Sequence, residues 1–236
     1  MTETHHSSQP RQTYHHGHLH EVLVKKGLEM ARSGGTEAVV LREATRRAGV
    51  SPNAAYRHFA NREALLDEVG LAAADQIGVV MREAVAEAQP IDDESVAVSQ
   101  LVAACRAYLD FALTEPGLFD VAYRISDTGL DALNVDRSKA PNLPDSVIQD
   151  VLSDREVTLS DRVDVRSLVI LLWSVLHGFA SLSTSGPLRG EKTPEWADRV
   201  LDVLRGSLRG ARERSAVFVG DALRAPTMWQ LPVTVL

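Results

Sequence analysis

Residues 41–58 read LREATRRAGVSPNAAYRH, and their pattern is the most informative in the chain about its fold. The first eight of these residues predict a short helix that stops at Gly49, because glycine readily adopts the positive φ of a sharp turn. Ser51 and Pro52 then signal a second helix, with serine as the N-cap and proline at the first helical position. Together with the apolar Val50 in the turn, this order predicts a helix-turn-helix. The competing interpretation is an ordinary helical hairpin.

A helix-turn-helix predicts contact with DNA through its second helix. A helix fits the major groove, and the amides at its N-terminus would point at phosphates or base edges. Asn53 lies near this N-terminus, where its amide could bond an adenine edge in two places. Arg42, at the start of the first helix, could reach a phosphate or a guanine. Arg46 and Arg47 could contact phosphates as well, or form only a solvated face.

Basic residues gather at the N-terminal end of an otherwise acidic chain. The net charge is −7, yet residues 1–65 carry nine Lys and Arg against six Glu. The remaining residues carry 16 basic and 26 acidic side chains, and seven of the eight histidines lie before residue 66. This asymmetry favours a polyanion-binding end on an acidic body, although chance variation in surface charge would give the same pattern.

The rest of the chain also predicts helices, so the expected fold class is all-α. Apolar spacing, caps and Pro or Gly breaks divide it, with a loop over residues 126–144. Only the tail from residue 216 onward could contain a strand. The helices predicted outside the motif span residues 18–33, 61–89, 95–114, 118–124, 145–152, 164–183 and 194–214.

The cysteine content and the lengths of the apolar runs indicate in which cellular compartment the protein is found. A lone cysteine, Cys105, excludes an intramolecular disulfide and suits a reducing cytoplasm. The longest apolar run, residues 168–176, is broken by Ser174 and is far shorter than the ~18 residues of a membrane span. The polar N-terminus has no apolar stretch typical of a signal peptide. We therefore expect a cytoplasmic protein with no membrane contact.

Two further stretches make a family resemblance recognisable. The run Tyr14-His15-His16-Gly17 and the run YRHFANREALL at residues 56–66 flank and extend the motif. Trp173, His177 and Gly178 form a Trp…His-Gly pattern farther on. Together these residues resemble the TetR (tetracycline-repressor-like) family of transcriptional regulators, with a C-terminal domain of the type often called WHG.

The resemblance implies a homodimer in which each subunit has a DNA-binding head and a larger helical, ligand-binding body. The expected domains are a flexible arm (1–13), the head (14–60), the ligand-binding and dimerisation body (61–215) and an apolar tail packed on the body (216–236). Ala44-Thr45 replaces the usual large aliphatic residue followed by Ala, which predicts a slightly less stable head.

The family also implies roles for particular side chains in the head. Tyr56 and His58 match positions that contact phosphates, and Arg62 lies where the family commonly places a basic phosphate contact. Phe59 is expected in the core of the head. The full set of predicted DNA-binding residues is Arg42, Ser51, Pro52, Asn53, Ala54, Tyr56, Arg57, His58 and Arg62.

In the body, Trp173 and His177 are four residues apart and share one face of an apolar helix. They could form a core stack, or the wall of a pocket in which His177 bonds an effector; both can hold together. The predicted pocket residues are Trp173, His177, Tyr108, Phe111, Arg106, Met81, Phe119 and Tyr123.

The 164–183 helix is apolar on nearly all sides, so two opposite faces of it must be buried. One side can face its own core, and the other a partner subunit, together with the 194–214 helix. Such a dimer would place two recognition helices about one DNA turn (~34–36 Å) apart on a pseudo-palindrome.

The predicted function is a ligand-responsive repressor that a small, largely apolar effector releases from double-stranded operator DNA. The alternatives are a ligand-independent DNA-binding protein and an all-helical enzyme using His177. No Gly-x-Ser-x-Gly elbow, His-Glu-x-x-His motif or phosphate-binding glycine loop supports an enzyme. The N-terminal histidines, including the pair His16 and His20, lack the cysteine or carboxylate partners of a metal site. We expect no metal and no cofactor.

Overall fold

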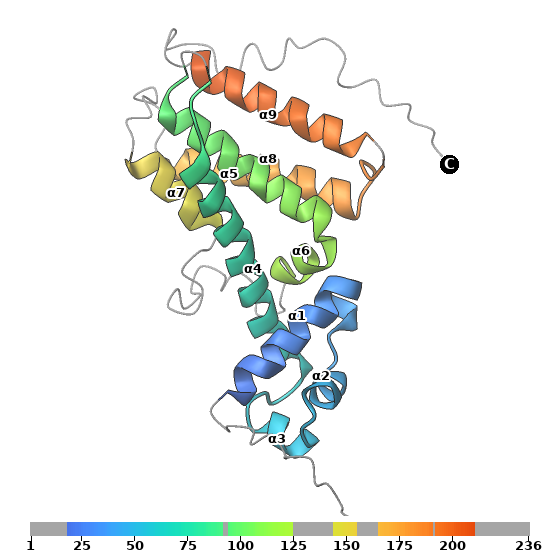
Figure 1. Ribbon diagram of the computed structural model, residues 1–236. Helices are drawn as coiled ribbons and strands as arrows, with labels where there is room; N and C mark the ends of the chain where they lie inside the picture. Colours follow the sequence, from blue (N-terminus) through green and yellow to red (C-terminus); the bar gives the residue numbers. More distant parts are fainter. Residues whose placement is uncertain (1–17, 92–93, 125–143, 155–164, 191, 211–236) are drawn as a thin grey trace, which may run out of the picture.

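The computed structural model describes residues 18–91, 94–124, 144–154, 165–190 and 192–210. These residues form nine helices, arranged as a small head and a larger body (Figure 1). The all-α prediction is therefore confirmed. The predicted arm at 1–13, the tail at 216–236 and nearly all of the loop at 126–144 lie outside the described residues.

The head contains α1 (Leu19–Ala38), α2 (Leu41–Ala48) and α3 (Pro52–Tyr56). The turn between α2 and α3 has the predicted chemistry: Gly49 is left-handed at φ +68° and ψ +28°. The Ser51 hydroxyl caps α3 by accepting a hydrogen bond from the Ala54 amide at 3.3 Å. The helix-turn-helix geometry thus follows from local signals at these positions.

The glycine pair interrupts helix α1 where the sequence predicts the helix to end. Gly34 and Gly35 have non-helical backbone angles, with Gly35 at φ +62°, and one further turn follows to Ala38. A carboxylate from the body meets this kink, because Asp120 Oδ2 accepts a hydrogen bond from the Thr36 amide at 2.7 Å. The glycine pair therefore bends α1 at its contact with the body.

The hydrophobic core of the head extends past residue 60. It includes Leu65, Leu66 and Val69 from α4, as well as Leu118 and Val121 from α6. Its other buried members are Leu19, Leu23, Met30, Ala31, Val39, Leu41, Ala44, Ala48, Ala55, Phe59 and Ala73. Head and body are thus joined through apolar packing.

The unusual pair Ala44-Thr45 is accommodated in this core. Ala44 is fully buried, and Thr45 is only 4% exposed. The Thr45 hydroxyl donates to the Arg42 carbonyl at 2.6 Å, so its polar atom is satisfied inside α2.

The body comprises α4 (Arg62–Glu87), α5 (Val96–Thr114), α6 (Pro116–Ala122), α7 (Pro144–Asp154), α8 (Val165–Thr184) and α9 (Thr193–Gly210). Side chains of Asn61 and Ser95 cap α4 and α5, and these are the residues at which the sequence predicts the two helices to begin. The sequence places the start of α6 two residues late, because Pro116 occupies the first turn of the helix. Helix α9 is described to Gly210, so its predicted extension to Arg214 lies beyond the described residues.

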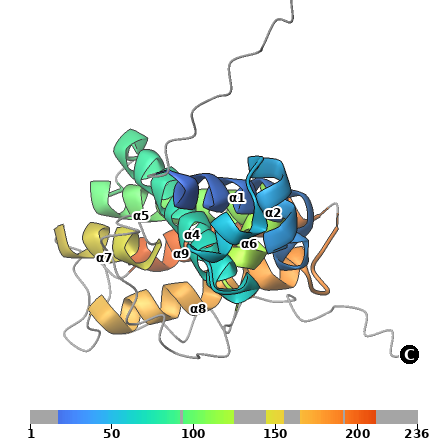
Figure 2. The ribbon, with the colours of Figure 1, turned by 90° about the horizontal axis from the view of Figure 1, so that it is seen from below.

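Helices α5 and α8 carry most of the apolar character of the body. Among the described helices, Val96–Thr114 and Ser167–Thr184 are long and apolar enough, by length and composition alone, to cross a membrane. Helix α5 packs against α4, α6, α7, α8 and α9, which makes it the central core helix. Helix α8 lies along one side of the body (Figure 2), with Leu168, Leu172 and Leu176 in the core. Only one of its two faces is buried in this chain, because Ile170, Leu171, Val175 and Leu182 are exposed.

Candidate functional site

The side of the head formed by α2 and α3 exposes most of the residues predicted to bind DNA. Asn53, Arg57 and His58 are exposed, and Tyr56 is 49% exposed although it is aromatic. An exposed tyrosine beside an asparagine, an arginine and a histidine provides donors that suit phosphates and base edges. This surface is the candidate nucleic-acid interface.

Three of the predicted DNA-binding residues lie at the start of α3, the second helix of the helix-turn-helix. Ser51 caps α3, and Pro52 occupies its first position. Ala54 is half-buried. These residues form the N-terminus of α3. They would therefore affect DNA binding both through their own contacts and through the position of α3.

Arg62 has contacts that differ from the phosphate contact implied by the resemblance. Its guanidinium donates to the Val39 carbonyl at 2.8 Å and to the Thr36 carbonyl at 2.8 Å. These carbonyls lie at the end of α1, where the last backbone acceptors lack the regular helical hydrogen bond; the Thr36 carbonyl also accepts from the Val39 amide at 3.2 Å. The fork of a guanidinium can satisfy two such acceptors at once. Arg62 therefore joins α4 to the end of α1 in this structure.

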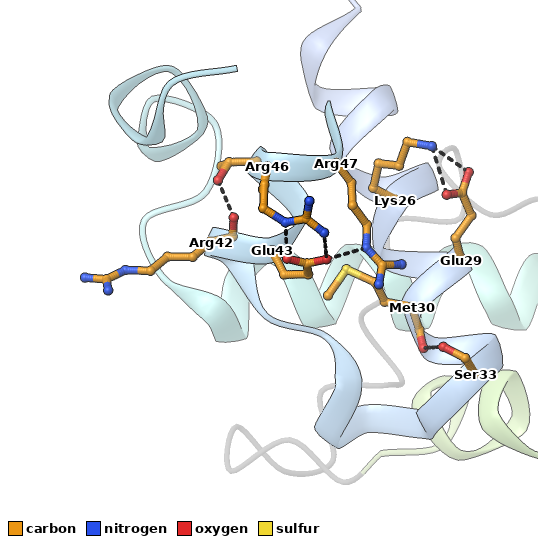
Figure 3. A network of polar contacts seen from close by, with 9 residues as sticks. Lys26, Glu29, Met30, Ser33, Arg42, Glu43, Arg46 and Arg47 are labelled. Carbon is orange, nitrogen blue, oxygen red and sulfur yellow. Dashed lines mark hydrogen bonds and ion pairs between the residues drawn. The ribbon is translucent and has the colours of Figure 1, made fainter. Parts of the chain in front are cut away.

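Helix α2 carries three arginines, and two of them bind one carboxylate (Figure 3). Arg46 donates to both oxygens of Glu43, at 2.8 Å and 2.7 Å, and Arg47 donates to Oε1 at 2.7 Å. These hydrogen bonds lower the pKa of Glu43 to about 2. Arg42 lies beside this group, but its guanidinium extends away from it.

Phe59 closes the head, as the sequence predicts, and is 2% exposed. The His20 ring stacks on it with a centroid distance of 4.8 Å, and His58 meets His20 edge-on at 6.2 Å. Within the described part of the chain, no group of three or more His, Cys, Asp or Glu side chains could hold a metal ion.

A second cluster of functional candidates lies in the body. The rings of Trp173 and His177 stack almost in parallel, 5.8 Å apart with an interplanar angle of 6°. Tyr108, Phe119 and Tyr123 surround them, and the Tyr123 ring lies 4.7 Å from His177. The structure therefore brings together five of the eight residues predicted for the pocket. We call these five rings the aromatic cluster.

Three of the polar groups in the aromatic cluster are the Tyr108 and Tyr123 hydroxyls and the His177 imidazole. The Tyr108 hydroxyl and His177 Nδ1 share a hydrogen bond of 3.0 Å. Burial lowers the pKa of His177, so its neutral form is favoured. Burial also raises the pKa of Tyr108 and Tyr123. The buried Tyr123 hydroxyl has no hydrogen-bond partner among the described residues. These groups offer a neutral hydrogen-bonding environment between aromatic walls.

The other three predicted pocket residues lie elsewhere. Arg106 is exposed and forms an ion pair with Asp198 of α9 at 2.7 Å. Met81 is fully buried in the body core, and Phe111 packs against the cores of both head and body. A separate hollow of about 590 Å³ lies between α4, α5 and α7. It is lined by Arg82, Val85, Ala86, Gln100, Val147, Asp150, Val151 and Ser153, and by no residue of the aromatic cluster.

Helix α6 connects the aromatic cluster to the head, which the sequence does not predict. Phe119 and Tyr123 belong to the cluster, while Asp120 binds the Thr36 amide of α1. Glu115, which begins α6, accepts a hydrogen bond from Arg32 of α1 at 2.9 Å. The only local signal at this position is the helix break at Glu115-Pro116-Gly117. That break shows where α6 begins but gives no information on its partners.

Arg124 follows α6 and adds a second connection. It binds Glu63 at 2.7 Å and Asp67 at 2.5 Å, both in the first turns of α4. Its side chain is only 16% exposed, so these ion pairs are better shielded than most surface pairs. Residues 115–124 thus contact both helices that hold the helix-turn-helix.

Taken together, the fold and the exposed recognition surface define a helix-turn-helix DNA-binding protein with a helical body. Two family profiles match the chain. The profile for bacterial regulatory proteins of the tetR family matches residues 23–69. The profile for the tetracyclin repressor-like C-terminal domain matches residues 101–204, a range that includes all five residues of the aromatic cluster. The two matches together cover more than half of the chain, and the chain belongs to the TetR family of DNA-binding transcriptional regulators.

Solved structures agree on the fold. A protein of unknown function from Rhodococcus sp. RHA1 has a TM-score of 0.63 and 24% identity, over 83% of this chain and 98% of that one. A TetR-family regulator from Pectobacterium atrosepticum has a TM-score of 0.57 and 20% identity, over 85% and 97%. A TetR variant from Acinetobacter baumannii AYE in complex with minocycline has a TM-score of 0.51 and 17% identity, over 82% and 97%. The search of curated proteins found no match.

Proposed function

We propose that this regulator is a cytoplasmic, homodimeric repressor that leaves its operator when a small molecule binds its body. The observation that carries the proposal is the position of α6. Phe119 and Tyr123 belong to the aromatic cluster, and Asp120 binds α1 of the head. A ligand that moves the rings of the cluster would therefore move a helix attached to the DNA-binding head.

The proposed DNA contacts come from the exposed residues of α2 and α3. Tyr56, Arg57 and His58 would bind phosphates, and Asn53 would read a base edge. Arg42 would reach a phosphate or a guanine from the start of α2. We keep the proposed head at residues 14–60 as the unit that contacts DNA, with α4 contributing to its core.

The proposed effector is a largely apolar molecule with a neutral hydrogen-bonding group. Five aromatic rings would provide its contact surface, and the hydroxyls of Tyr108 and Tyr123 would meet its polar atoms. Burial of an unpartnered hydroxyl is unfavourable, so a ligand atom bonded to Tyr123 would gain from satisfying it. A protein with a similar fold binds a small molecule, minocycline, which supports a small-molecule effector for this regulator.

The proposed dimer interface uses α8 and α9. Leu171, Val175 and Leu182 recur along one face of α8, and each is more than 40% exposed in the single chain. Val203 of α9 is 54% exposed. A partner subunit that packs the same two helices against these would bury this apolar surface in a four-helix interface.

Thermodynamic linkage sets the condition for release. The effector must bind the conformation that does not fit the operator more tightly than the one that does. Operator DNA must then weaken effector binding by the same factor. The test is to measure effector affinity with and without operator DNA, and operator affinity with and without effector. These measurements distinguish a ligand-responsive repressor from a DNA-binding protein that does not respond to ligands.

The test is a binding selection from random duplex DNA at fixed salt. Wild-type protein is expected to recover a pseudo-palindrome, and a Tyr56→Ala/His58→Ala variant is expected to bind that sequence at least 10-fold more weakly. Glu83→Ala, an exposed substitution on the body part of α4, serves as the control and should bind like wild type. Sequence-independent, salt-sensitive binding alone would contradict operator recognition. A recovered operator whose affinity no compound in a broad screen changes would contradict the ligand response.

A further inference from the structure

The exposed side of α2 presents three arginines and one glutamate. Leu41, Ala44, Thr45 and Ala48 are buried, so the other positions of the helix face outward. At about 100° per residue, position 43 falls between positions 46 and 47 around the helix axis. Arg42 and Arg46 are four residues apart and share one side. Glu43 is therefore surrounded by cations on the surface that adjoins α3.

The contacts divide these arginines into two groups. Arg46 and Arg47 share the Glu43 carboxylate through three hydrogen bonds of 2.7–2.8 Å. Arg42 makes no ion pair with any described residue, and its guanidinium points away from the carboxylate (Figure 3). The three side chains carry the same charge, but only Arg42 is free to meet a phosphate without giving up a partner.

We propose that Glu43 is a specificity-determining residue, which withholds Arg46 and Arg47 from DNA phosphates and so weakens binding to non-operator DNA. This inference rests on the DNA-binding function of the head. To bind a phosphate, either arginine must leave the carboxylate or bring that negative charge close to the DNA. Breaking the ion pair and bringing the carboxylate near DNA both reduce the favourable electrostatic energy of the contact between arginine and phosphate.

The effect falls mainly on non-specific complexes because these depend almost entirely on phosphate contacts and counterion release. Such complexes have no fixed register, so they use any cation that can reach the backbone. In the operator complex, α3 sets the register and base contacts add affinity. Exposed ion pairs are individually weak, so the expected change is moderate.

The experiment measures binding of the full-length protein to two duplexes over a series of salt concentrations. One duplex has random sequence, and the other is the palindrome recovered by selection. For Glu43→Gln, we expect affinity for the random duplex to rise roughly 3- to 10-fold at low salt. The slope of log K against log salt should steepen by about 0.9 for each additional phosphate contact, that is by about 0.9 to 1.8. The affinity for the palindrome should rise less. The ratio of palindrome affinity to random-duplex affinity therefore falls.

Two controls separate this role from a general charge effect. Glu29→Gln removes the same charge from the head, but Glu29 binds Lys26 on α1 and leaves the contacts of Glu43 intact. The triple variant Glu43→Gln/Arg46→Gln/Arg47→Gln removes the two arginines along with the carboxylate. We expect neither to show the steeper slope. Thermal unfolding verifies that every variant is folded, as expected for changes at exposed or half-buried positions.

Three results would overturn the proposal. Equal gains for Glu43→Gln and Glu29→Gln would show that only net charge matters. Weaker binding of Glu43→Gln to both duplexes would show that the carboxylate orients the arginines for productive phosphate contacts. An unchanged salt slope would show that Arg46 and Arg47 do not reach DNA. If wild-type protein binds neither duplex, the DNA-binding function itself fails, and this inference fails with it.

Discussion

At the scale of single residues, the environment of a side chain decides its role more than its type does. Arg42, Arg46, Arg47 and Arg62 are all arginines near the helix-turn-helix. Arg62 satisfies two carbonyls at the end of α1, and two others share Glu43. Among these four, only Arg42 has no ion pair with a described residue. A count of basic residues would have treated all four as equal candidates for DNA contact.

His177 gives a prediction about pH at the same scale. Burial lowers its pKa in the folded protein below the value of about 6.5 for an unperturbed histidine. The unfolded chain therefore binds the proton more readily, so this residue makes stability fall as pH drops through about 6.5 and leaves it unaffected well above. We expect wild type to lose more stability than His177→Gln between about pH 7.5 and about pH 5.5.

Urea unfolding of both proteins at the two pH values measures this difference. Other titrating groups are common to the two proteins, so they cancel in the comparison. An equal loss of stability in wild type and His177→Gln would mean that His177 titrates normally and is not desolvated in the aromatic cluster.

At the scale of elements, α6 depends on a close approach to α1. A Cβ added at Gly117 would lie 2.2 Å from the Ala31 carbonyl oxygen and 3.1 Å from the Arg32 carbonyl oxygen. These are backbone atoms, which cannot move aside as a flexible side chain can. Glycine at this position therefore lets α6 pack directly against α1, where Asp120 and Glu115 make their bonds.

We expect Gly117→Ala to destabilise the fold by about 1–3 kcal/mol, because overpacking forces the two helices apart. The free energy of unfolding in urea measures the loss. Gly190→Ala is the control, since a Cβ there meets no atom within 4 Å and should change stability by less than about 0.5 kcal/mol. A Gly117→Ala protein as stable as wild type would show that α6 and α1 are not held this closely.

At the scale of the whole molecule, the apolar face of α8 indicates that one chain is not the functional unit. Leu171 and Val175 are 43% and 48% exposed, on a helix whose opposite face is buried. Such a surface is costly to leave in water, and a second copy could cover it. Two heads held by one interface would explain how a short recognition helix reads a long palindrome.

We expect Leu171→Glu to convert a dimer into a monomer, because it would place a charge in the apolar interface. Light scattering after size-exclusion chromatography measures the mass. Ile91→Glu, at an exposed apolar position between α4 and α5, should leave the dimer intact. A dimer in both variants would place the interface elsewhere.

The helix-turn-helix, most helix boundaries and the family could be predicted from the amino-acid sequence alone. These depend on local signals: the Ser51 and Asn61 caps and the turn at Gly49 act within a few residues, so they can be read along the chain. The Trp173 and His177 stack was also predictable from their spacing of four residues.

Contacts between residues that are distant in the sequence could not be predicted in this way, because they depend on tertiary packing. Arg62 lies 26 residues from Thr36, and Asp120 lies 84 residues from the same threonine. Their pairing depends on how α4 and α6 pack against α1, and no local pattern encodes that packing. The same reason separates Arg106, which pairs with Asp198, from Tyr108, which joins the aromatic cluster two positions later on the same helix. Positions two residues apart on a helix face different neighbours, and the packing of the body determines what those neighbours are.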